Sequence, residues 1–344
     1  MDYVDDYLFD GDFILLGEDG TVVTEKGKPV LQQIHGKSWV NNHAHVITAD
    51  NQIDFHFLYY LLMDTDVRAI VTGAVQPKIS QANLKTVMVS VPDLQTQRKI
   101  AAVLSALDDK IENNRRICKT LEEMAQAIFK SWFVDFEPWG GVMPEGWRRG
   151  TLSDVGEIVG GATPSKSRSD YYTENGIAWI TPKDLSVQKT KFVSRGEVDI
   201  SEAGFKNASV KMMPRGSVLF SSRAPIGYVA IAQNQVCTNQ GFKSVVPKSD
   251  VGTAFIYEFL SINVPLVEER ASGSTFKEIS LVGMRDIPLC VPALDATRRY
   301  ERLVEPLFRQ QEVLESEVHR LVGMRDALLP KLMSGEIDVD KVVV

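Results

Sequence analysis

The sequence predicts an α+β protein with two globular modules, the first shortened at its N-terminal side, separated by two long antiparallel coiled-coil helices with pseudo-twofold symmetry. One unit of sequence occurs twice at an offset of 200 residues, a repeating apolar seam follows each copy, and short apolar runs bounded by Gly and Pro fill the copies. These features are typical of a repeated domain, a coiled coil and β-strands, respectively.

The composition is that of an ordinary globular chain. Its 344 residues are 44% hydrophobic and 24% charged, which suits two domains. No uncharged apolar run reaches about 18 residues and the start has no signal-peptide pattern, so we expect a cytoplasmic protein without membrane contact. Cys118, Cys237 and Cys290 are too few and too far apart for a disulfide framework or a cysteine zinc site.

The charge is distributed unevenly along the chain. The net charge is -7, but residues 147–280 hold 16 Lys and Arg against 13 Asp and Glu, whereas residues 1–92 hold 6 against 12. A net acidic chain is unusual for a protein that binds phosphate. Because the acidity comes mainly from residues 1–92, it does not exclude nucleic-acid binding by the second module.

The repeat is clearest between residues 72–92 and 272–292, where TGAVQPKISQANLKTVMVSVP aligns with SGSTFKEISLVGMRDIPLCVP. The offset of 200 persists without a gap into the helical segments that follow. We therefore interpret the chain as one unit used twice. Upstream the register drifts, and the aligned pairs are Phe57 with Phe255, Asn42 with Asn239 and Gly11 with Gly216.

The two copies differ in length on their N-terminal side. The second copy opens at Trp147, so 69 residues precede Gly216, whereas 10 residues precede Gly11. About 59 residues of the second copy thus have no counterpart in the first. We expect either a reading frame whose start has been assigned too late, or a shortened chain that depends on its second module and pairs with another subunit.

Each copy is followed by apolar positions that alternate in steps of four and three residues, as in a coiled coil. Pro306 predicts a start or a kink of the second helix. The first seam comprises Ile100, Leu104, Leu107, Ile111, Asn114, Cys118, Leu121, Ala125, Ile128 and Trp132. The second comprises Tyr300, Val304, Leu307, Gln311, Leu314, Val318, Leu321, Arg325, Leu328 and Leu332.

Such a seam is also compatible with homodimerisation or ordinary core packing. Two like modules, each followed by a like helix on one chain, instead favour pairing of the helices within the chain, and duplex DNA has the matching pseudo-twofold symmetry. The predicted segments are a partial first module (1–92), a first spacer helix (93–134), a linker (135–146), a second module (147–292), a second spacer helix (293–335) and a C-terminal tail (336–344).

Candidate DNA-binding residues lie in polar loops of both modules. Basic side chains suit phosphate, and Asn, Gln, Ser and Thr suit base edges, although Asn and Gln in turns are often turn formers. In the second module the candidates are Thr163, Ser165, Lys166, Arg168, Lys183, Ser222, Arg223, Asn239, Gln240, Thr275 and Lys277. In the first module they are Lys37, Asn42 and Lys78.

Enzymatic interpretations have little support in the sequence. The run at 160–167 resembles a phosphate-binding loop, but Ser165 replaces its second glycine. His43 and His45 would project from one face of a strand, yet no carboxylate or thiolate lies at a recognisable zinc-site spacing. The second module has no histidine to activate a serine or cysteine. We therefore expect a binding protein with no catalytic residues and no metal site.

The combination of motifs resembles the specificity subunit of type I restriction-modification enzymes. The motifs are PEGW at 144–147, GGATP at 160–164, IAWITPKDL at 177–185, LLPKLMSGEID at 328–338 and an IS…L…VP element before each helix. They extend over essentially the whole chain and are specific only in combination.

This resemblance implies that each module is a target recognition domain for one half of a bipartite DNA site, and that the paired helices act as a ruler. The implied partners are double-stranded DNA, two modification (methyltransferase) subunits and restriction (motor-nuclease) subunits. S-adenosylmethionine, ATP and Mg are expected on those subunits, with no cofactor and no catalysis in this chain.

The chain departs from the family pattern in its first module, which lacks the portion from PEGW to ITPKDL. Two alternatives therefore stay open. The chain is a shortened specificity subunit that acts through its second module with another copy, or it is a coiled-coil adaptor protein that does not bind DNA.

Overall fold

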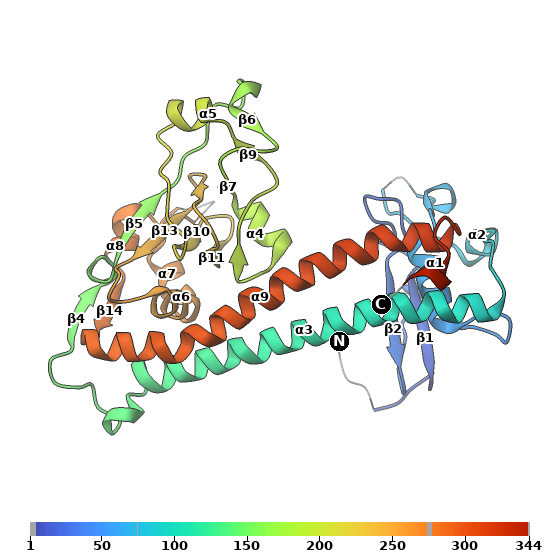
Figure 1. The fold of residues 1–344 in the computed structure, drawn as a ribbon, viewed down its shortest axis with the longest axis horizontal. Coiled ribbons are helices and arrows are strands. Elements are labelled where there is room, and N and C mark those ends of the chain that lie inside the picture. The colour runs from blue at the N-terminus through green and yellow to red at the C-terminus, as the bar shows by residue number, and fades with distance from the viewer. Residues whose placement is uncertain (1–4, 74, 274–276, 343–344) are drawn as a thin grey trace. The chain divides into compact units, whose positions relative to one another are not determined.

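The chain folds into two units, each of which combines one module with parts of both long helices (Figure 1). Unit 1 comprises residues 1–113 and 317–344, and unit 2 comprises residues 114–316. The structure, a computed structural model, describes residues 5–73, 75–273 and 277–342. The expected α+β fold with two modules and long paired helices is confirmed. Within the described ranges no helix is both long and apolar enough to cross a bilayer.

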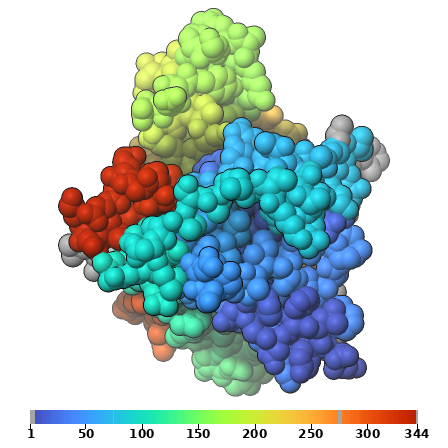
Figure 2. Space-filling model, turned by 90° about the vertical axis from the view of Figure 1, so that its right-hand side faces the viewer, coloured from blue at the N-terminus to red at the C-terminus, as the bar shows by residue number. Residues whose placement is uncertain are grey.

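The first module is built on a three-stranded antiparallel sheet in the order β2-β1-β3. Ile14 and Leu16 of the central strand are fully buried, which places the core of this module under β1. Figure 2 looks onto unit 1, with the N-terminal residues in blue and the segment leading into the first long helix in cyan. The strands are β1 (Asp12–Gly17), β2 (Leu31–His35) and β3 (Ala44–Ile47).

One helix connects this sheet to the long helices. α1 (Phe55–Asp64) begins after Asp54, whose carboxylate accepts hydrogen bonds from two backbone N–H groups of the first turn, as a preferred N-cap residue does. Its apolar face packs with Leu104 and Leu329 in one cluster. The remaining helical elements of the module and tail are η1 (Arg68–Ile70), α2 (Gln81–Leu84) and η5 (Val339–Lys341).

The second module contains a five-stranded sheet in the order β5-β13-β10-β11-β8, in which β8 alone runs parallel to its neighbour. Two-stranded pairs β14-β4, β12-β7 and β6-β9 complete its described strands. The strands are β4 (Arg148–Thr151), β5 (Gly156–Gly160), β6 (Tyr172–Thr173), β7 (Trp179–Ile180), β8 (Phe192–Val193), β9 (Asp199–Ile200), β10 (Val218–Ser222), β11 (Ile226–Ala232), β12 (Cys237–Thr238), β13 (Lys243–Pro247) and β14 (Pro288–Val291).

Helix α6 (Thr253–Ile262) is buried over nearly its whole length and lies in the main core of unit 2. This explains its almost wholly apolar sequence, since a helix with neighbours on every side has no polar face. The linker before the module contains η2 (Glu137–Trp139). The helical elements of the module are η3 (Leu152–Asp154), η4 (Ser169–Tyr171), α4 (Pro182–Gln188), α5 (Glu202–Asn207), α6 (Thr253–Ile262), α7 (Val264–Arg270) and α8 (Leu281–Arg285).

The two long helices are α3 (Leu94–Phe133) and α9 (Leu294–Met333), each of 40 residues. Within each unit the two helices run antiparallel, since residues later in α3 contact residues earlier in α9. α9 begins at Leu294, so a start near Pro306 is wrong. Tyr300 and Val304 are fully buried before that proline, and their packing supports the helix through it.

The predicted seam of α3 holds from Ile100 to Ala125, all of whose members are buried. It fails in the last two turns, where Phe129 and Phe133 are buried instead of the predicted Ile128 and Trp132. Phe133 packs against Phe255, Tyr300 and Trp147, with ring centroids 4.9, 5.0 and 5.7 Å apart. The module core, as well as the partner helix, therefore sets the buried face at this end.

The polar interruption at Arg325 is matched across the helix pair of unit 1. Arg325 Nη1 lies 2.7 Å from Asp108 Oδ1, and the other oxygen of Asp108 accepts a 2.7 Å hydrogen bond from Tyr60 of α1. Both charged side chains are partly buried, so removal of either one would leave the other without its partner in a partly desolvated site. This contact ties α1 to both long helices.

The corresponding contact in unit 2 centres on Lys191, whose side chain is 2% exposed. Its ammonium lies 2.6 Å from Glu122 Oε2 on α3, 3.6 Å from Glu258 Oε1 on α6 and 3.4 Å from the ring centroid of Phe308 on α9. Glu315 of α9 accepts the backbone N–H of Lys191 at 3.1 Å. Burial raises the pKa of Glu258 to about 8 despite the nearby ammonium.

Strand pairing confirms the repeat and corrects its register upstream. β1, β2 and β3 correspond to β10, β11 and β13. The register is fixed by the backbone hydrogen bonds of Ile79 to Glu18 and of Ile279 to Ser222, because Ile79 and Ile279 are equivalent at the offset of 200. By this register Gly216 corresponds to Asp12, so the predicted match with Gly11 is wrong by one residue. The two glycines occupy different turns, with φ of 84° and 141°. The matched pairs are Ile14 with Val218, Gln33 with Ile231 and Ile47 with Val245.

We expect Glu258→Gln to abolish one component of the pH dependence of stability. Between about pH 4.5 and 8 the unfolded chain loses the Glu258 proton while the folded chain keeps it, so stability falls as pH rises through this window. Denaturant unfolding across that range should show a smaller fall for the variant than for the unchanged chain. Glu123→Gln, at an exposed position of α3, should leave the slope as it is, and an unchanged slope in Glu258→Gln would contradict the expectation.

Candidate functional site

A polar cluster lies where β10 ends beside the start of β13. Lys243 Nζ is 3.2 Å from Ser222 Oγ, 3.4 Å from Gln240 O and 3.0 Å from Glu278 Oε1. The second carboxylate oxygen of Glu278 lies 3.3 Å from Arg223 Nη1. We call these five residues the β10–β13 cluster.

Antiparallel pairing explains how the cluster forms. The chain leaving β10 is bridged to the segment before α8, through Arg223 and Glu278, while Ser222 ends the strand that lies beside β13. Ser222 is fully buried and Lys243 is largely buried, whereas the side chains of Arg223 and Glu278 are 38% and 36% exposed. The accessible part of the cluster therefore comprises the Arg–Glu pair and the exposed Gln240, while the lysine is largely covered.

The Gly-rich loop after β5 joins this cluster through Thr163, whose hydroxyl donates to Gln240 Oε1. The close approach requires glycine at Gly161, because a Cβ there would lie 2.0 Å from a backbone carbonyl oxygen beyond β12. Tyr172 OH donates a 2.6 Å hydrogen bond to Pro164 O and fixes the loop from its other side. Four predicted residues, Thr163, Ser222, Arg223 and Gln240, are thus brought together.

The other predicted residues of this loop lie outside the cluster. The Ser165 hydroxyl is 2.9 Å from that of Ser167. Arg168 donates twice to Asp170, at 2.8 Å each, which holds its guanidinium in place. Lys166 is exposed, and its ammonium makes no hydrogen bond or ion pair with the residues that the structure describes. Lys166 is therefore the cation of this loop that a phosphate could reach without displacing a carboxylate.

The remaining basic candidates of the second module are dispersed. Lys183, in the first turn of α4, lies 2.8 Å from Glu197 at a highly exposed position. Lys277 is exposed and precedes the cluster along the chain. Thr275 lies outside the described residues.

Asn239 forms a turn. Its Oδ1 accepts the backbone N–H of Gly241 at 2.8 Å, and Asn41 Oδ1 accepts that of His43 at 3.0 Å in the same way. The counterpart of Asn239 is therefore Asn41, and the predicted equivalence with exposed Asn42 is wrong by one residue. Two adjacent asparagines made the sequence alignment ambiguous, and the turn geometry resolves it.

Equivalent positions of the first module carry charges of opposite sign. The backbone bridge between Asp19 and Lys78 corresponds to the bridge between Arg223 and Glu278. Lys78 Nζ is itself paired with Glu18 at 3.0 Å. Around this bridge the first module therefore has two acidic residues, Glu18 and Asp19, and one basic residue, Lys78. At the same place the second module has two basic residues, Arg223 and Lys243, and one acidic residue, Glu278.

Other polar candidates of the first module are engaged within unit 1. Lys37 Nζ lies 4.7 Å above the ring centroid of Tyr7. His43 Nδ1 is 2.8 Å from Asp19 Oδ1, and His45 Nε2 is 2.7 Å from a backbone carbonyl. Within the described ranges no group of three or more His, Cys, Asp or Glu side chains could hold a metal ion.

Sequence reasoning missed Lys243 and Glu278, which connect the predicted residues. Lys243 is separated by 20 residues from Arg223, and Glu278 by 35 residues from Lys243, so neither forms a local motif with its partner. The available signal was Lys243 at the first position of the apolar run KSVVP. A lysine at the first position of a buried strand can extend its ammonium past the end of that strand toward water.

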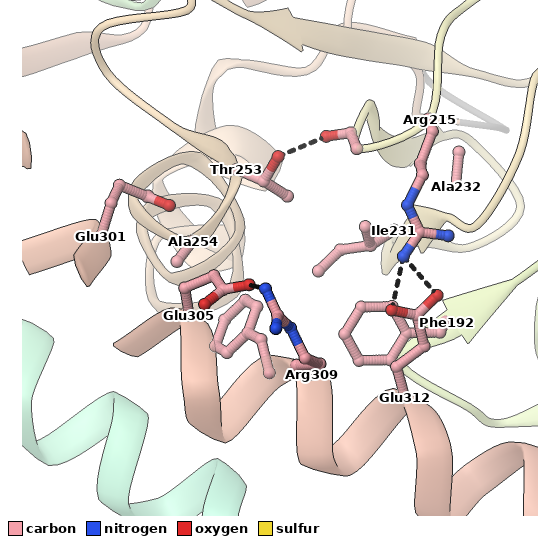
Figure 3. Close-up of a pocket in the computed structure, with 12 residues that line it drawn as sticks. Phe192, Arg215, Ile231, Ala232, Thr253, Ala254, Glu301, Glu305, Arg309 and Glu312 are labelled. Atoms are coloured by element: carbon pink, nitrogen blue, oxygen red, sulfur yellow. Dashed lines mark hydrogen bonds and ion pairs between the residues drawn. The ribbon is translucent and has the colours of Figure 1, made fainter. Parts of the chain in front are cut away.

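A separate cavity of about 330 Å³ lies between the second module and α9 (Figure 3). Arg215 reaches from the loop before β10 to Glu312 of α9, with Nη2 2.7 and 2.6 Å from the two carboxylate oxygens. Arg309 pairs with Glu305 one turn earlier on the same helix. Both arginines of the lining are thus already paired, and Glu301, which also lines the cavity, accepts the backbone N–H of Phe255 at 2.8 Å.

Comparison with known proteins gives consistent matches. Residues 1–123 and 144–316 match the family described as Type I restriction modification DNA specificity domain. The chain is 34% identical over 194 residues to the MjaIX specificity subunit of Methanocaldococcus jannaschii, covering 54% of this chain and 45% of that subunit. It is 27% identical over 332 residues to the HindI specificity subunit of Haemophilus influenzae, covering 76% of this chain and 71% of that subunit.

The fold is similar to the crystal structure of a type I restriction-modification S subunit from M. genitalium, with a TM-score of 0.63 at 16% identity. That similarity covers 96% of this chain and 84% of the other. The match to MjaIX spans less than half of that subunit. Since the family match takes in most of the sequence and both modules, the chain belongs to the type I restriction-modification DNA specificity family.

Proposed function

We propose that this chain selects the DNA sequence on which a type I restriction-modification complex acts, with its second module as the principal DNA-contacting part. Modification subunits with S-adenosylmethionine and restriction subunits with ATP and Mg would supply the chemistry while docked on this chain. Membership of the specificity family and the names of the related subunits support this role.

The observation that carries the proposal is the β10–β13 cluster with its attached loop. Arg223, Gln240 and Thr163 come from three separate segments and meet at one polar site. Guanidinium and amide groups suit the donors and acceptors of base edges, and hydroxyls suit either bases or phosphate. Lys166 adds a cation that no described carboxylate neutralises. A phosphate-contacting residue beside base-contacting residues is the usual composition of a sequence-specific interface.

The charge of the cluster also supports selective contact. Glu278 holds Arg223 and Lys243, so the three side chains together carry one positive charge. A duplex must compete with this carboxylate, which disfavours indiscriminate phosphate binding. The second module as a whole remains basic, with 16 Lys and Arg against 13 Asp and Glu in residues 147–280. Long-range attraction to DNA and local discrimination would thus come from different residues.

The buried thiols support a non-catalytic role for the chain. Burial raises the pKa of Cys118 to about 11 and that of Cys237 to about 12. A thiol with such a pKa stays protonated at neutral pH and is a poor nucleophile. Their surroundings favour packing over chemistry.

Enrichment from a pool of random duplexes tests the proposal directly. We expect the chain, bound to its modification subunits, to retain duplexes that share one sequence pattern in a mobility-shift selection. The same selection with the modification subunits alone is the control. Failure of the complex to enrich any pattern beyond the control would refute sequence selection and would favour the adaptor alternative.

Removal of exposed cations should weaken DNA binding in two distinguishable ways. We expect Lys166→Ala to reduce affinity similarly for all sequences and to lower the salt dependence by about one counterion. Arg223→Ala should cost about 1–3 kcal/mol on the selected sequence and less on others if it contacts a base. Lys206→Ala, an exposed lysine of α5, is the matched control. Titrations at several salt concentrations would measure both effects, and equal behaviour of the three variants would contradict the assignment.

Neutralising the acid of the cluster should have the opposite effect on overall affinity. Glu278→Gln frees Arg223 and Lys243 from a carboxylate, so we expect tighter binding to non-selected duplexes and a smaller ratio between selected and non-selected sequences. Glu174→Gln changes the same charge at an exposed position of the module and should leave that ratio unchanged. An unaltered ratio in Glu278→Gln would show that this carboxylate has no part in discrimination.

A further inference from the structure

The loop after β5 holds an arginine–carboxylate pair, formed by Arg168 and Asp170, whose geometry differs from that of the β10–β13 cluster. Arg168 Nε lies 2.8 Å from Asp170 Oδ1, and its Nη2 lies 2.8 Å from Oδ2, so this edge of the guanidinium is occupied. The Nη1–Nη2 edge makes no hydrogen bond or ion pair with any residue that the structure describes, and the side chain is 58% exposed. Because a guanidinium is planar, the pair presents two parallel N–H donors to solvent.

The pair is held in place by its neighbours. The guanidinium carbon of Arg168 lies 4.9 Å from the ring centroid of Tyr171. Tyr171 O accepts the backbone N–H of Ser201 at 2.9 Å, and Ser201 Oγ donates to Asp170 O at 2.7 Å. A Cβ at Gly204 of α5 would lie 2.4 Å from Tyr171 O, so glycine allows this close packing. The arginine is therefore oriented before any ligand binds, at the end of the module where α5, β6 and β9 lie together (Figure 1).

Two parallel N–H donors match either two oxygens of a phosphate or O6 and N7 of a guanine. The Asp170 carboxylate favours the guanine, because it already neutralises Arg168 and would lie close to a bound phosphate of like charge. The major-groove edge of guanine is uncharged and has no such penalty. Adenine places a donor beside N7, and thymine places a methyl group beside O4, so neither base accepts both N–H groups.

Arg223 lacks this arrangement. Glu278 contacts it at Nη1, 3.3 Å away, so the carboxylate lies at the end of the guanidinium that a guanine would use. Arg168 is contacted through Nε and Nη2, which leaves that end accessible. Of these two predicted arginines, Arg168 is thus the one already arranged for bidentate contact with a base.

We propose that Arg168, oriented by Asp170 and Tyr171, contacts a guanine in the major groove of the DNA sequence that the second module selects. The inference rests on the function proposed above and adds the identity of one base. Asp170 and Tyr171 are positioning residues. The exposed Lys166, two residues earlier, suits the neighbouring phosphate, which gives the loop one cation for the backbone and one for a base.

The experiment uses the chain bound to its modification subunits and a selection from random duplexes. We expect one guanine of the pattern selected by the unchanged chain to become unrestricted with Arg168→Ala, while the other positions are retained. Arg168→Lys keeps the charge without the planar fork, so it should lose the same guanine preference and keep the salt dependence of binding. Thermal melting would establish that both variants are folded.

Base analogues at the identified guanine leave the protein unaltered. Replacement by 7-deazaguanine removes the N7 acceptor, and we expect it to weaken binding of the unchanged chain by about tenfold but to have no effect with Arg168→Ala. Inosine lacks only the amino group in the minor groove, so it is the control and should bind both proteins within about twofold of guanine.

Asp170→Asn tests the positioning role. Without the carboxylate, Arg168 gains a net charge that a phosphate can use, so we expect a weaker guanine preference together with a salt dependence larger by about one counterion. A merely structural loss would not raise the salt dependence. Glu174→Gln removes the same charge at an exposed position nearby and should leave both quantities unchanged.

Three results would overturn this inference while sparing the function proposed above. They are a selected pattern in which no guanine depends on Arg168, an equal effect of 7-deazaguanine on the unchanged chain and on Arg168→Ala, or a uniform loss of affinity in Arg168→Ala with the salt dependence reduced by about one counterion, which would assign the residue to phosphate. Failure of the complex to enrich any pattern would instead remove the proposed function and this inference together.

Discussion

The antiparallel pairing of α3 and α9 is the constraint on which both units depend, and buried charge fixes it in each. In unit 1, Asp108 joins Arg325 of the opposite helix to Tyr60 of α1. In unit 2, Lys191 joins β8 to α3 through Glu122. Buried ion pairs add little net stability but are costly to break, so they specify one arrangement over others. Each module is thereby attached to the long helices by a buried charged residue whose oppositely charged partner lies on one of those helices.

The helical part of the fold could be predicted from the spacing of apolar residues, because the seam follows the four- and three-residue steps of a coiled-coil helix. That rule was sufficient from Ile100 to Ala125. It failed where Phe129 and Phe133 turn toward an aromatic core built from Phe255 and Tyr300, since packing with residues distant in sequence overrides the local pattern. Arg325 illustrates the same limit, because this charged residue of the second seam has its partner, Asp108, on the other helix, which the spacing of the seam does not indicate.

The candidate site could be predicted only as a set of loops. Polar residues that follow strands were recognisable, and four of them do meet. Their common contacts with Lys243 and Glu278 arise from strand adjacency, which no local spacing encodes. The two errors of register have one cause: identical residues were aligned where hydrogen bonding is conserved one position away, at Asn41 and Asp12.

Comparison of the two copies of the repeat distinguishes positions that maintain the core from charged positions at the ends of the sheet. Positions that face the module core keep their apolar character in both copies, as with Leu16 and Phe220, which have the same place in the ladder. Positions at the sheet end exchange sign, as with the bridge of Asp19 to Lys78 and its counterpart of Arg223 to Glu278. A core position must exclude water whatever the protein binds, whereas a surface charge at the end of a strand can be reversed at little cost to stability. Charge reversal at the sheet ends is what a scaffold requires if each module is to contact a different partner through the same frame.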